Sequence, residues 1–313
     1  MWTRYRQLRA RGILSINRRN SDYVLRYNPR KLYPLVDDKL QTKRLALAAN
    51  IAVPALYALI KTERQIKVLD EILAPYTDFV IKPAHGAGGD GILVITSRVF
   101  GRYRQINGKL LTTQEMAYHL SCLLSGAYSL GGHADYAMVE HRVVVDPVFA
   151  EISHEGVPDI RVITLLGYPA MAMVRLPTRL SGGKANLHQG AIGAGIHLAT
   201  GMTLGGVFHN DVIDYHPDTL NSTLNIQVPY WDKILEIAAR CYELTGLGYL
   251  GVDIVLDKDH CPLMLELNAR PGLNIQIANR VGILDRYRAI EAQAARGPLS
   301  VLERVAFSQS LGL

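Results

Sequence analysis

The chain has 313 residues, of which 49% are hydrophobic and 20% charged, and its formal net charge is +6. This is a globular composition, large enough for two or three lobes. No apolar run is long enough to span a membrane, and the start of the chain lacks the apolar core of a secretory signal. Three widely spaced cysteines, Cys122, Cys241 and Cys261, form neither a disulfide framework nor a zinc knuckle, which favours a cytoplasmic location.

Much of the positive charge lies near the N-terminus. Six arginines cluster there: Arg4, Arg6, Arg9, Arg11, Arg18 and Arg19. Such a run is typical of a solvated helix face or an oligomer contact, and an acidic partner is the alternative. We expect no nucleic-acid partner, because no nucleic-acid motif accompanies the charge and aromatic residues, at 7%, are too sparse for a stacking platform.

The periodicity of apolar residues predicts alternating helices and strands. In chain order they are a helix over 37–50, a connection or strand over 51–57, a helix over 62–74, strands over 78–83 and 91–96, a helix over 112–124, strands over 136–140, 160–166 and 170–176, a helix over 231–245 closed by Gly246, and two strands over 251–268. Hairpins in place of regular crossovers favour an α+β fold with mostly antiparallel sheets.

The last two strands carry three polar residues in apolar surroundings. A hairpin over 251–268 with its tip at 259–260 places Asp253 opposite Glu266, and Glu266 shares a face with Asn268. Two carboxylates that face each other repel unless a cation lies between them. Oxygen ligands without Cys or His suit magnesium or manganese. The alternative is a solvated hairpin with its polar residues outside.

A glycine-rich loop follows the strand that ends at Lys82. Four glycines within residues 85–91 let the backbone approach a ligand and present N–H groups to phosphate oxygens, and the lysine adds a positive charge. The loop fits neither the Walker nor the dinucleotide pattern, because it joins two strands without opening a helix. Taken alone, the loop is equally consistent with a flexible hairpin. Lys43 on the first helix is a second candidate, although a lone lysine there is more typical of the protein surface.

Two other strand segments carry charges. Exposed backbone at the strand end near Glu140 could pair with an adenine edge, although an ordinary strand end is the alternative. Asp159 and Arg161 point the same way along one strand, so they could form an ion pair that aims the guanidinium into a cavity. Arg175 places a further charge in the next apolar strand, and purely structural pairing is the alternative for all three.

A mobile-looking loop over 181–190 carries Lys184, Asn186 and His188. A solvent loop is the alternative, and no carboxylate nearby in sequence orients His188 as a base. The chain has no Gly-x-Ser-x-Gly element, which removes the common serine hydrolases. Cys122 has no Cys–His signature around it, which argues against a catalytic thiol.

Taken in order, these motifs resemble the ATP-grasp superfamily of carboxylate–amine ligases. The resemblance rests on Phe79-Val-Ile-Lys82-Pro with its glycine loop, on Asp159-Ile-Arg161, and on Glu266-Leu-Asn268-Ala-Arg-Pro-Gly272. The Asp-Ile-Arg and Asn-Leu-His elements resemble the α-L-glutamate ligase branch. Residues 12–20 and 28–39 resemble its "α-L-glutamate ligase-like" subgroup.

The resemblance implies an ATP-grasp fold in which two α/β lobes clamp ATP. The N-terminal lobe would be residues 37–138 with the glycine-rich loop, and the C-terminal lobe residues 139–313 with the metal and substrate site. Residues 1–36 would be a basic segment in place of the full α/β domain that usually precedes the lobes. Because that domain often helps to bind the acceptor, a second copy of the chain or a partner protein would complete the acceptor site.

The resemblance also implies a role for each candidate residue. ATP phosphates would be contacted by Lys43, Lys82, His85, Gly86, Gly88, Gly89 and Gly91. Adenine and ribose would be held by Glu140, His141 and Val143. Two magnesium ions, with manganese as the alternative, would be held by Asp253, Glu266 and Asn268. The acyl phosphate or the substrate carboxylate would be met by Arg161, Arg175 and Arg270, with Asn186 and His188 as further catalytic candidates.

The implied activity is ATP-dependent amide formation through an acyl phosphate. The enzyme would add an amino acid, glutamate by resemblance, to a peptide or amino-acid acceptor. One alternative is an ATP-binding regulatory or assembly module that has lost its chemistry, and the intact Lys82, Asp253 and Glu266 argue against it. The other is a kinase-type phosphoryl transfer to a hydroxyl group.

Overall fold

The computed structural model describes residue 7 and residues 10–86, 88–209, 211–259 and 261–312. Arg4, Arg6 and Arg9 of the basic cluster and His260 at the expected hairpin tip lie outside the described residues. The chain divides into two compact units. The large unit comprises Met1–Asp37, Leu45–Ala52 and Val144–Leu313, and the small unit comprises Asp38–Arg44 and Val53–Val143.

The small unit is built on one antiparallel sheet. Within the described residues the sheet has six strands in the order β1-β6-β2-β3-β4-β5. These strands are β1 (Leu56–Ile60), β2 (Phe79–Pro83), β3 (Leu93–Val99), β4 (Arg102–Gln105), β5 (Leu110–Leu111) and β6 (Ala137–Glu140). The helices are α6 (Glu63–Ile66), α7 (Leu69–Leu73), α8 (Thr113–Leu124) and the short 3-10 helix η3 (Leu130–Gly132). A capping box between Thr112 and Glu115 begins α8, whose apolar side packs on the sheet.

The large unit is built on a longer antiparallel sheet. Among the described residues its path is β11-β10-β9-β8-β7-β13-β14, with β12 paired to β10. The strands are β7 (Asp159–Leu165), β8 (Tyr168–Leu176), β9 (Ile192–Ile196), β10 (Met202–Phe208), β11 (Asp211–Ile213), β12 (Leu224–Gln227), β13 (Tyr249–Asp257) and β14 (Cys261–Asn268). Helix α5 (Lys39–Ala48) contributes residues to both units.

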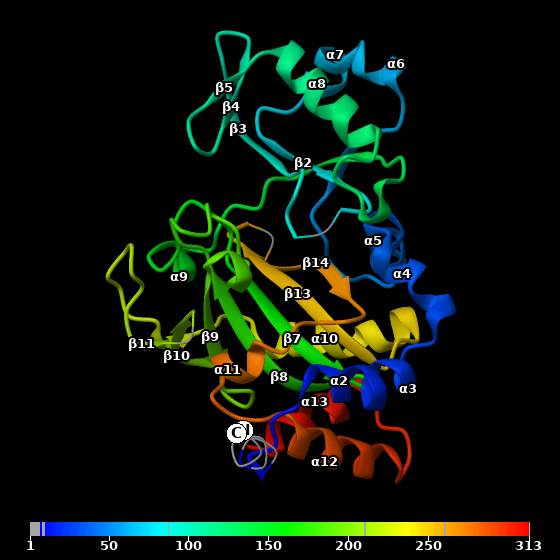
Figure 1. Ribbon diagram of the computed structural model, residues 1–313, viewed down its shortest axis with the longest axis vertical. Helices are drawn as coiled ribbons and strands as arrows, with labels where there is room; N and C mark the ends of the chain where they lie inside the picture. The colour runs from blue at the N-terminus through cyan, green and yellow to red at the C-terminus, as the bar shows by residue number, and fades with distance from the viewer. Residues whose placement is uncertain (1–6, 8–9, 87, 210, 260, 313) are drawn as a thin grey trace. The chain divides into compact units, whose positions relative to one another are not determined.

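Helices pack against this sheet from two parts of the chain. The N-terminal ones are α2 (Ile16–Arg18), the π-helix η1 (Arg19–Val24), α3 (Leu25–Tyr27), the 3-10 helix η2 (Arg30–Leu32) and α4 (Pro34–Asp37). The later ones are α9 (Pro147–Ala150), the 3-10 helix η4 (Leu187–Gln189), α10 (Trp231–Thr245), α11 (Ile275–Ala278), α12 (Leu284–Ala294) and α13 (Val301–Ser310). In Figure 1, α2 and α3 lie near α12 and α13 at one end of the large unit.

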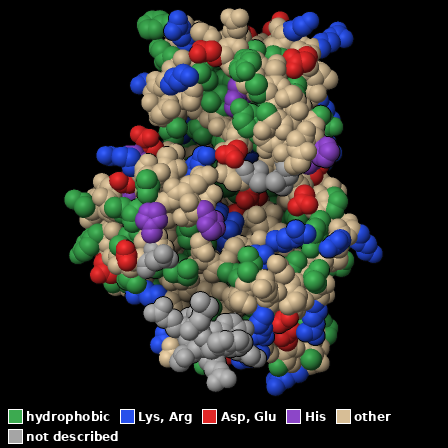
Figure 2. Space-filling model, in the orientation of Figure 1, with side chains coloured by type: hydrophobic (Ala, Val, Ile, Leu, Met, Phe, Trp, Pro, Cys, Tyr) green, Lys and Arg blue, Asp and Glu red, His purple; other side chains and the backbone are tan. Residues whose placement is uncertain are grey.

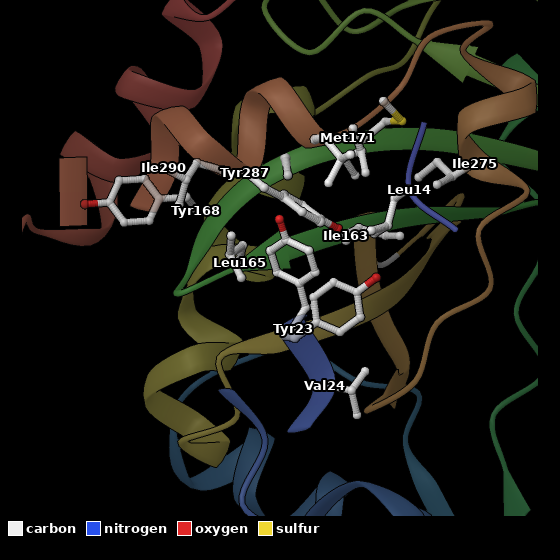
Figure 3. Close-up of a cluster of buried hydrophobic side chains, with 14 of the residues drawn as sticks. Leu14, Tyr23, Val24, Ile163, Leu165, Tyr168, Met171, Ile275, Tyr287 and Ile290 are labelled. Carbon is white, nitrogen blue, oxygen red and sulfur yellow. The ribbon is translucent and has the colours of Figure 1, made fainter. Parts of the chain in front are cut away.

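One face of the central strands is apolar along one half and charged along the other. Residues 159, 161, 163 and 165 of β7 alternate onto the same face. Ile163 and Leu165 join a buried cluster with Tyr23, Tyr249 and Tyr287. Figure 3 shows Ile163 and Leu165 together with Tyr23 and Tyr287. The first half of the same strand carries the charged residues of the candidate site. Leu14, Tyr23 and Val24 belong to the same cluster, so residues 14–24 cover the apolar half of the face.

The expected α+β fold with mostly antiparallel sheets is confirmed, since every strand pairing in the described residues is antiparallel. The expected single helix over 62–74 is wrong: α6 and α7 are separate, because the chain leaves helical geometry at Val68. Strands β4 and β5 and strands β9 to β12 were not expected. No helix in the described part of the chain is long and apolar enough to cross a membrane. On the face drawn in Figure 2, the described Lys and Arg side chains are interspersed with Asp and Glu.

Candidate functional site

A buried carboxylate joins the two lysines expected at the ATP phosphates. Glu140 is 2% exposed, and its two carboxylate oxygens lie 2.9 Å from Lys43 Nζ and 2.6 Å from Lys82 Nζ. Strands β2 and β6 bring Lys82 and Glu140 together, and α5 supplies Lys43, whose ammonium also donates to the carbonyl of Pro54. The three side chains expected at ATP are thus assembled within the small unit.

The positive charges of this lysine–glutamate group outnumber its negative charge. Burial lowers the pKa of Lys43, although Glu140 opposes the shift. Burial would raise the pKa of Glu140, yet Lys82 and Lys43 outweigh it and hold that pKa below its ordinary value. Glu140 is therefore ionised, and two lysines against one glutamate leave a net charge of +1. A partly desolvated group of this charge attracts an anion such as a phosphate.

The glycine-rich loop joins β2 to β3, as the sequence predicts. Gly88, Gly89 and Gly91 have positive φ angles of 68°, 82° and 75°, which side-chain-bearing residues rarely adopt. A Cβ atom on Gly86 would lie 2.2 Å from Pro83 Cγ, so this position is sterically restricted to glycine. Ala87 lies outside the described residues.

Asp135 supports the start of this loop. Its carboxylate accepts hydrogen bonds from the backbone N–H of His85 at 3.0 Å and from Ser129 Oγ at 2.6 Å, and it lies 2.7 Å from His85 Nδ1. Burial alone would raise the pKa of Asp135, but the hydrogen bonds from Ser129 and His85 hold it below the ordinary 3.8. His85 is thereby fixed at the entry of the loop. Sequence reasoning missed Asp135, because the residues it supports lie far away in the chain.

We expect Asp135→Asn to lower the free energy of unfolding at pH 7 by about 1–3 kcal/mol, because a buried hydrogen-bond acceptor is lost. A carboxyl group whose pKa is lower in the folded than in the unfolded protein stabilises the fold at pH values above its unfolded-state pKa. That stabilisation is lost as the pH falls through its folded-state pKa. The gap between variant and wild type should therefore shrink below about pH 4. Urea unfolding at pH 7, 5 and 3 measures it, with the exposed Asp211→Asn as the control. A gap that is independent of pH would contradict the role.

The other expected adenine and ribose contacts also lie in the small unit. His141 Nδ1 is 3.1 Å from the hydroxyl of Tyr57, whose ring stacks on Tyr76 with 4.2 Å between the ring centroids. Val143 is buried. Adenine and ribose binding by these residues remains a prediction.

In the large unit, an ion-pair ladder crosses β8, β7 and β13. Arg161 Nε and Nη2 donate to the two carboxylate oxygens of Asp253 at 2.7 and 2.6 Å. Arg175 donates to both oxygens of Asp159, and its Nη2 also lies 2.9 Å from Asp253 Oδ2. The register explains these pairs, because Asp253 lies opposite Arg161 and Asp159 lies opposite Arg175.

The ladder corrects one expectation and confirms another. Asp159 and Arg161 do not pair with each other, since each finds an oppositely charged partner across a strand boundary. The predicted pairing of Asp253 with Glu266 is confirmed. Nearer the turn the expected register is wrong, because a bulge after Asp253 shifts it by one residue and Asp257 pairs with Cys261.

The electrostatics of the ladder leave an excess of negative charge. Burial raises the pKa of Asp159 to about 6 despite Arg175, and the charge of Asp253 adds to this effect. Burial opposes ionisation of Asp253 too, but Arg161 and Arg175 hold its pKa well below the ordinary range. With Glu266 included, three carboxylates face two guanidinium groups. When all are ionised, the net charge is −1.

The expected metal ligands lie at the end of this ladder. Asn268 Nδ2 is 3.1 Å from Asp253 Oδ2 and 3.4 Å from Glu266 Oε1, so the three side chains converge. Among the described residues no group of three His, Cys, Asp or Glu side chains is suited to a metal, so a site here needs the Asn268 amide. Turning that amide presents its oxygen to the same point. Hard oxygen donors with excess negative charge fit magnesium. Asp253, however, already faces two guanidinium cations.

The remaining catalytic candidates are less enclosed. Arg270 is exposed, with its guanidinium carbon 5.0 Å from the centre of the Tyr33 ring. Asn186 accepts a hydrogen bond from the backbone N–H of His188 at 3.0 Å and so shapes the loop, while the His188 side chain is exposed. Catalytic roles for these three residues remain predictions.

The family of the chain follows from its sequence. A model of the family described as sugar-transfer associated ATP-grasp matches residues 18–292. The chain belongs to this family. The expected ATP-grasp fold is therefore confirmed, whereas the α-L-glutamate ligase-like subgroup stays a prediction. A search of curated proteins found no significant match.

Several solved ATP-grasp structures are similar to this ATP-grasp chain at low identity. The ATP-grasp ligase PsnB complexed with minimal precursor has 16% identity and a TM-score of 0.46, with 87% of this chain and 64% of that chain covered. D-cycloserine synthetase DcsG has 14% identity and a TM-score of 0.47, with 85% and 73% covered. The VanG D-Ala:D-Ser ligase from Enterococcus faecalis has 15% identity and a TM-score of 0.43, with 90% and 62% covered. The chain thus spans less than two thirds of PsnB.

Proposed function

We propose that this ATP-grasp protein is an ATP-dependent carboxylate–amine ligase that forms an amide bond through an acyl phosphate. The observation that carries the proposal is the juxtaposition, on one sheet face, of the Asp253 and Glu266 carboxylates with two guanidinium groups. This arrangement offers oxygen ligands for magnesium beside fixed cations for an anionic substrate. By the resemblance of its sequence motifs, the enzyme adds glutamate to a peptide or amino-acid acceptor.

The proposed reaction has two steps. A substrate carboxylate is a poor electrophile, because oxide is a poor leaving group. Its oxygen therefore attacks the γ-phosphorus of ATP, the bond to the bridging oxygen breaks, and ADP leaves. The amine nitrogen next attacks the acyl carbon, the carbon–oxygen bond breaks, inorganic phosphate leaves and the amine gives up a proton. Both steps move negative charge between oxygens, so alignment and charge neutralisation are what the protein must supply.

Each group of candidate residues would supply one part of this work. Lys43 and Lys82 would hold phosphate oxygens, and their net positive charge supports that role. Magnesium held by Asp253, Glu266 and Asn268 would neutralise phosphate oxygens. Arg161 and Arg175 would face the anionic substrate in a fixed orientation, because buried carboxylates hold both guanidinium groups.

Two loops would shield the acyl phosphate from water. One is the glycine-rich loop, whose first residues Asp135 holds in place. The other follows β8 and is closed at its base, where Thr178 Oγ1 donates to the carbonyl of Gly190 at 2.7 Å. A loop that is tied at its base and exposed at its tip can move as one lid.

The substrate is tested by mass spectrometry of products from a panel. Purified protein with ATP and magnesium is offered amino acids and peptides, together with sugar acids and amino sugars because of the family's description. ADP release with an amide product supports the ligase. A stable phosphorylated product would identify a kinase, and nucleotide binding without turnover would identify a silent module. Either result would overturn the proposal.

We expect Glu266→Gln to lower turnover on the order of 10²–10³-fold, as is typical when one group that stabilises transition-state charge is removed. Glu266 is only partly buried, so the fold should persist. The matched control is Glu236→Gln on α10, whose carboxylate pairs with Lys233 at the surface, and it should leave turnover unchanged. Both variants are assayed for ADP release under saturating ATP. Full activity of Glu266→Gln would remove this residue from the site.

A further inference from the structure

The segment that follows β14 carries two candidate site residues and is held by the N-terminal part of the chain. We call residues 268–272 the Asn-Arg segment, after Asn268 and Arg270. The Asn28 side chain, 2% exposed, donates from Nδ2 to the carbonyls of Tyr249 at 2.7 Å and Ala269 at 2.9 Å. Its Oδ1 accepts from the Tyr249 N–H at 2.9 Å. One buried amide thus ties the Asn-Arg segment to the start of β13.

Arg19 provides a second tie. Arg19 is 8% exposed. Its Nη1 donates to the carbonyl of Pro271 at 2.8 Å and lies 3.4 Å from the carbonyl of Arg270. Among the described residues its hydrogen bonds go to carbonyl and amide oxygens, and no carboxylate pairs with it. Burying a cation in this way is costly. Its bonds to the Asn-Arg segment therefore need a reason beyond the stability of the fold.

Two more contacts fix the same segment. The guanidinium of Arg270 lies over the Tyr33 ring at 5.0 Å, a cation–π distance. Pro271 lies against β13, where a Cβ atom on Gly251 would come within 2.7 Å of Pro271 Cβ. Gly251 is also the strand partner of Asn268. The segment is thus pressed onto β13 on one side and bonded to the N-terminal part on the other.

We propose that Arg19, Asn28 and Tyr33 are positioning residues for the Asn-Arg segment. By fixing the carbonyls of residues 269–271 they aim the Asn268 amide at Asp253 and Glu266, and Tyr33 sets the direction of the Arg270 guanidinium. The basic N-terminal segment thereby acts on the metal end of the site. The effect on metal binding rests on the proposed function.

The test compares two neighbouring arginines. Arg19→Ala removes the tie, whereas Arg18→Ala removes the same charge from a side chain that pairs with Asp22 on its own helical turn. Mn²⁺ is titrated into wild type and variants with saturating ADP, and free Mn²⁺ is followed by electron paramagnetic resonance. Outer residues that orient metal ligands typically contribute roughly 10- to 100-fold in affinity, so Arg19→Ala should bind Mn²⁺ at least tenfold more weakly. Arg18→Ala should bind it like wild type. Equal affinity of the two variants would overturn the proposal.

A second measurement, hydrogen exchange, tests the positioning role even if Arg19→Ala folds poorly or the wild type binds no Mn²⁺. Tyr33→Leu removes the ring from Arg270, whereas Tyr33→Phe keeps it. Hydrogen exchange of peptides that cover 266–275 should be faster in Tyr33→Leu and in folded Arg19→Ala than in their controls. Absence of Mn²⁺ binding by the wild type would count against the proposed function alone. Unchanged exchange in both variants would overturn the positioning role alone.

Discussion

Replacing Asp253 with asparagine is expected to destabilise the large unit by about 3–5 kcal/mol, because breaking a buried ion pair leaves an uncompensated charge. Asp253 is fully buried, and its oxygens accept from Arg161, Arg175 and Asn268. The new amide would direct N–H groups at other donors. Urea unfolding of the metal-free protein measures the loss, and turnover should disappear as well.

Glu266→Gln separates stability from chemistry in this experiment. Glu266 lies opposite Asp253 but is only partly buried, and the Asn268 amide lies a long 3.4 Å from its Oε1. Its substitution should change the free energy of unfolding by no more than about 1 kcal/mol, as for other weakly engaged positions. If Asp253→Asn proves as stable as Glu266→Gln, the guanidinium groups do not depend on Asp253, and the ladder lacks the structural role assigned to it.

Replacing Lys82 with methionine should weaken ATP binding by roughly 10- to 100-fold, the range expected when one hydrogen bond to a charged group is lost. The variant should also unfold more easily, because Glu140 would keep only Lys43 as its buried partner. Isothermal titration with a non-hydrolysable ATP analogue measures the affinity, and urea unfolding measures the stability.

The double variant Lys82→Met with Glu140→Gln distinguishes the two roles of the lysine. It removes one charge of each sign, so the buried group keeps its net charge of +1 and much of the lost stability should return. Nucleotide affinity should stay low, because the ammonium group itself is gone. Wild-type affinity in the single variant would show that Lys82 serves only to neutralise Glu140.

The parts of the site that lie close together in sequence could be predicted. A period of two predicted Asp253 opposite Glu266, and this pairing is observed because the bulge after Asp253 offsets the one-residue error in the expected turn. Gly246 ends α10 with a positive φ of 68°, as expected. The bulge after Asp253 has no sequence signal in an apolar strand. Had the register at the turn continued, Leu265 would lie opposite Asp253, and Glu266 would face the other side of the sheet.

Contacts between distant segments could not be predicted. Whether Arg161 pairs with Asp159 or with Asp253 depends on which strands are neighbours, and no local pattern tells that β13 lies beside β7. The same holds for the hydrogen bonds that Arg19 and Asn28 make to residues 269–271, because these partners lie more than 200 residues away in the sequence. The break near Val68 was missed because its residues have ordinary helix propensity, and tertiary packing decides such cases.

The packing of both chain ends against the sheet of the large unit also limits how short an expression fragment can be. The family match begins at residue 18 and ends at 292, yet Leu14 exchanges two backbone hydrogen bonds with the buried amide of Gln276. Beyond the other limit, Phe307 of α13 packs its ring against Tyr168 at 5.7 Å. An expression fragment trimmed to the family limits would remove both hydrogen bonds between that amide and Leu14, leaving it the 3.3 Å bond from the Ile283 N–H, and would expose an aromatic surface. The minimal foldable fragment is therefore longer than the stretch by which the family is detected.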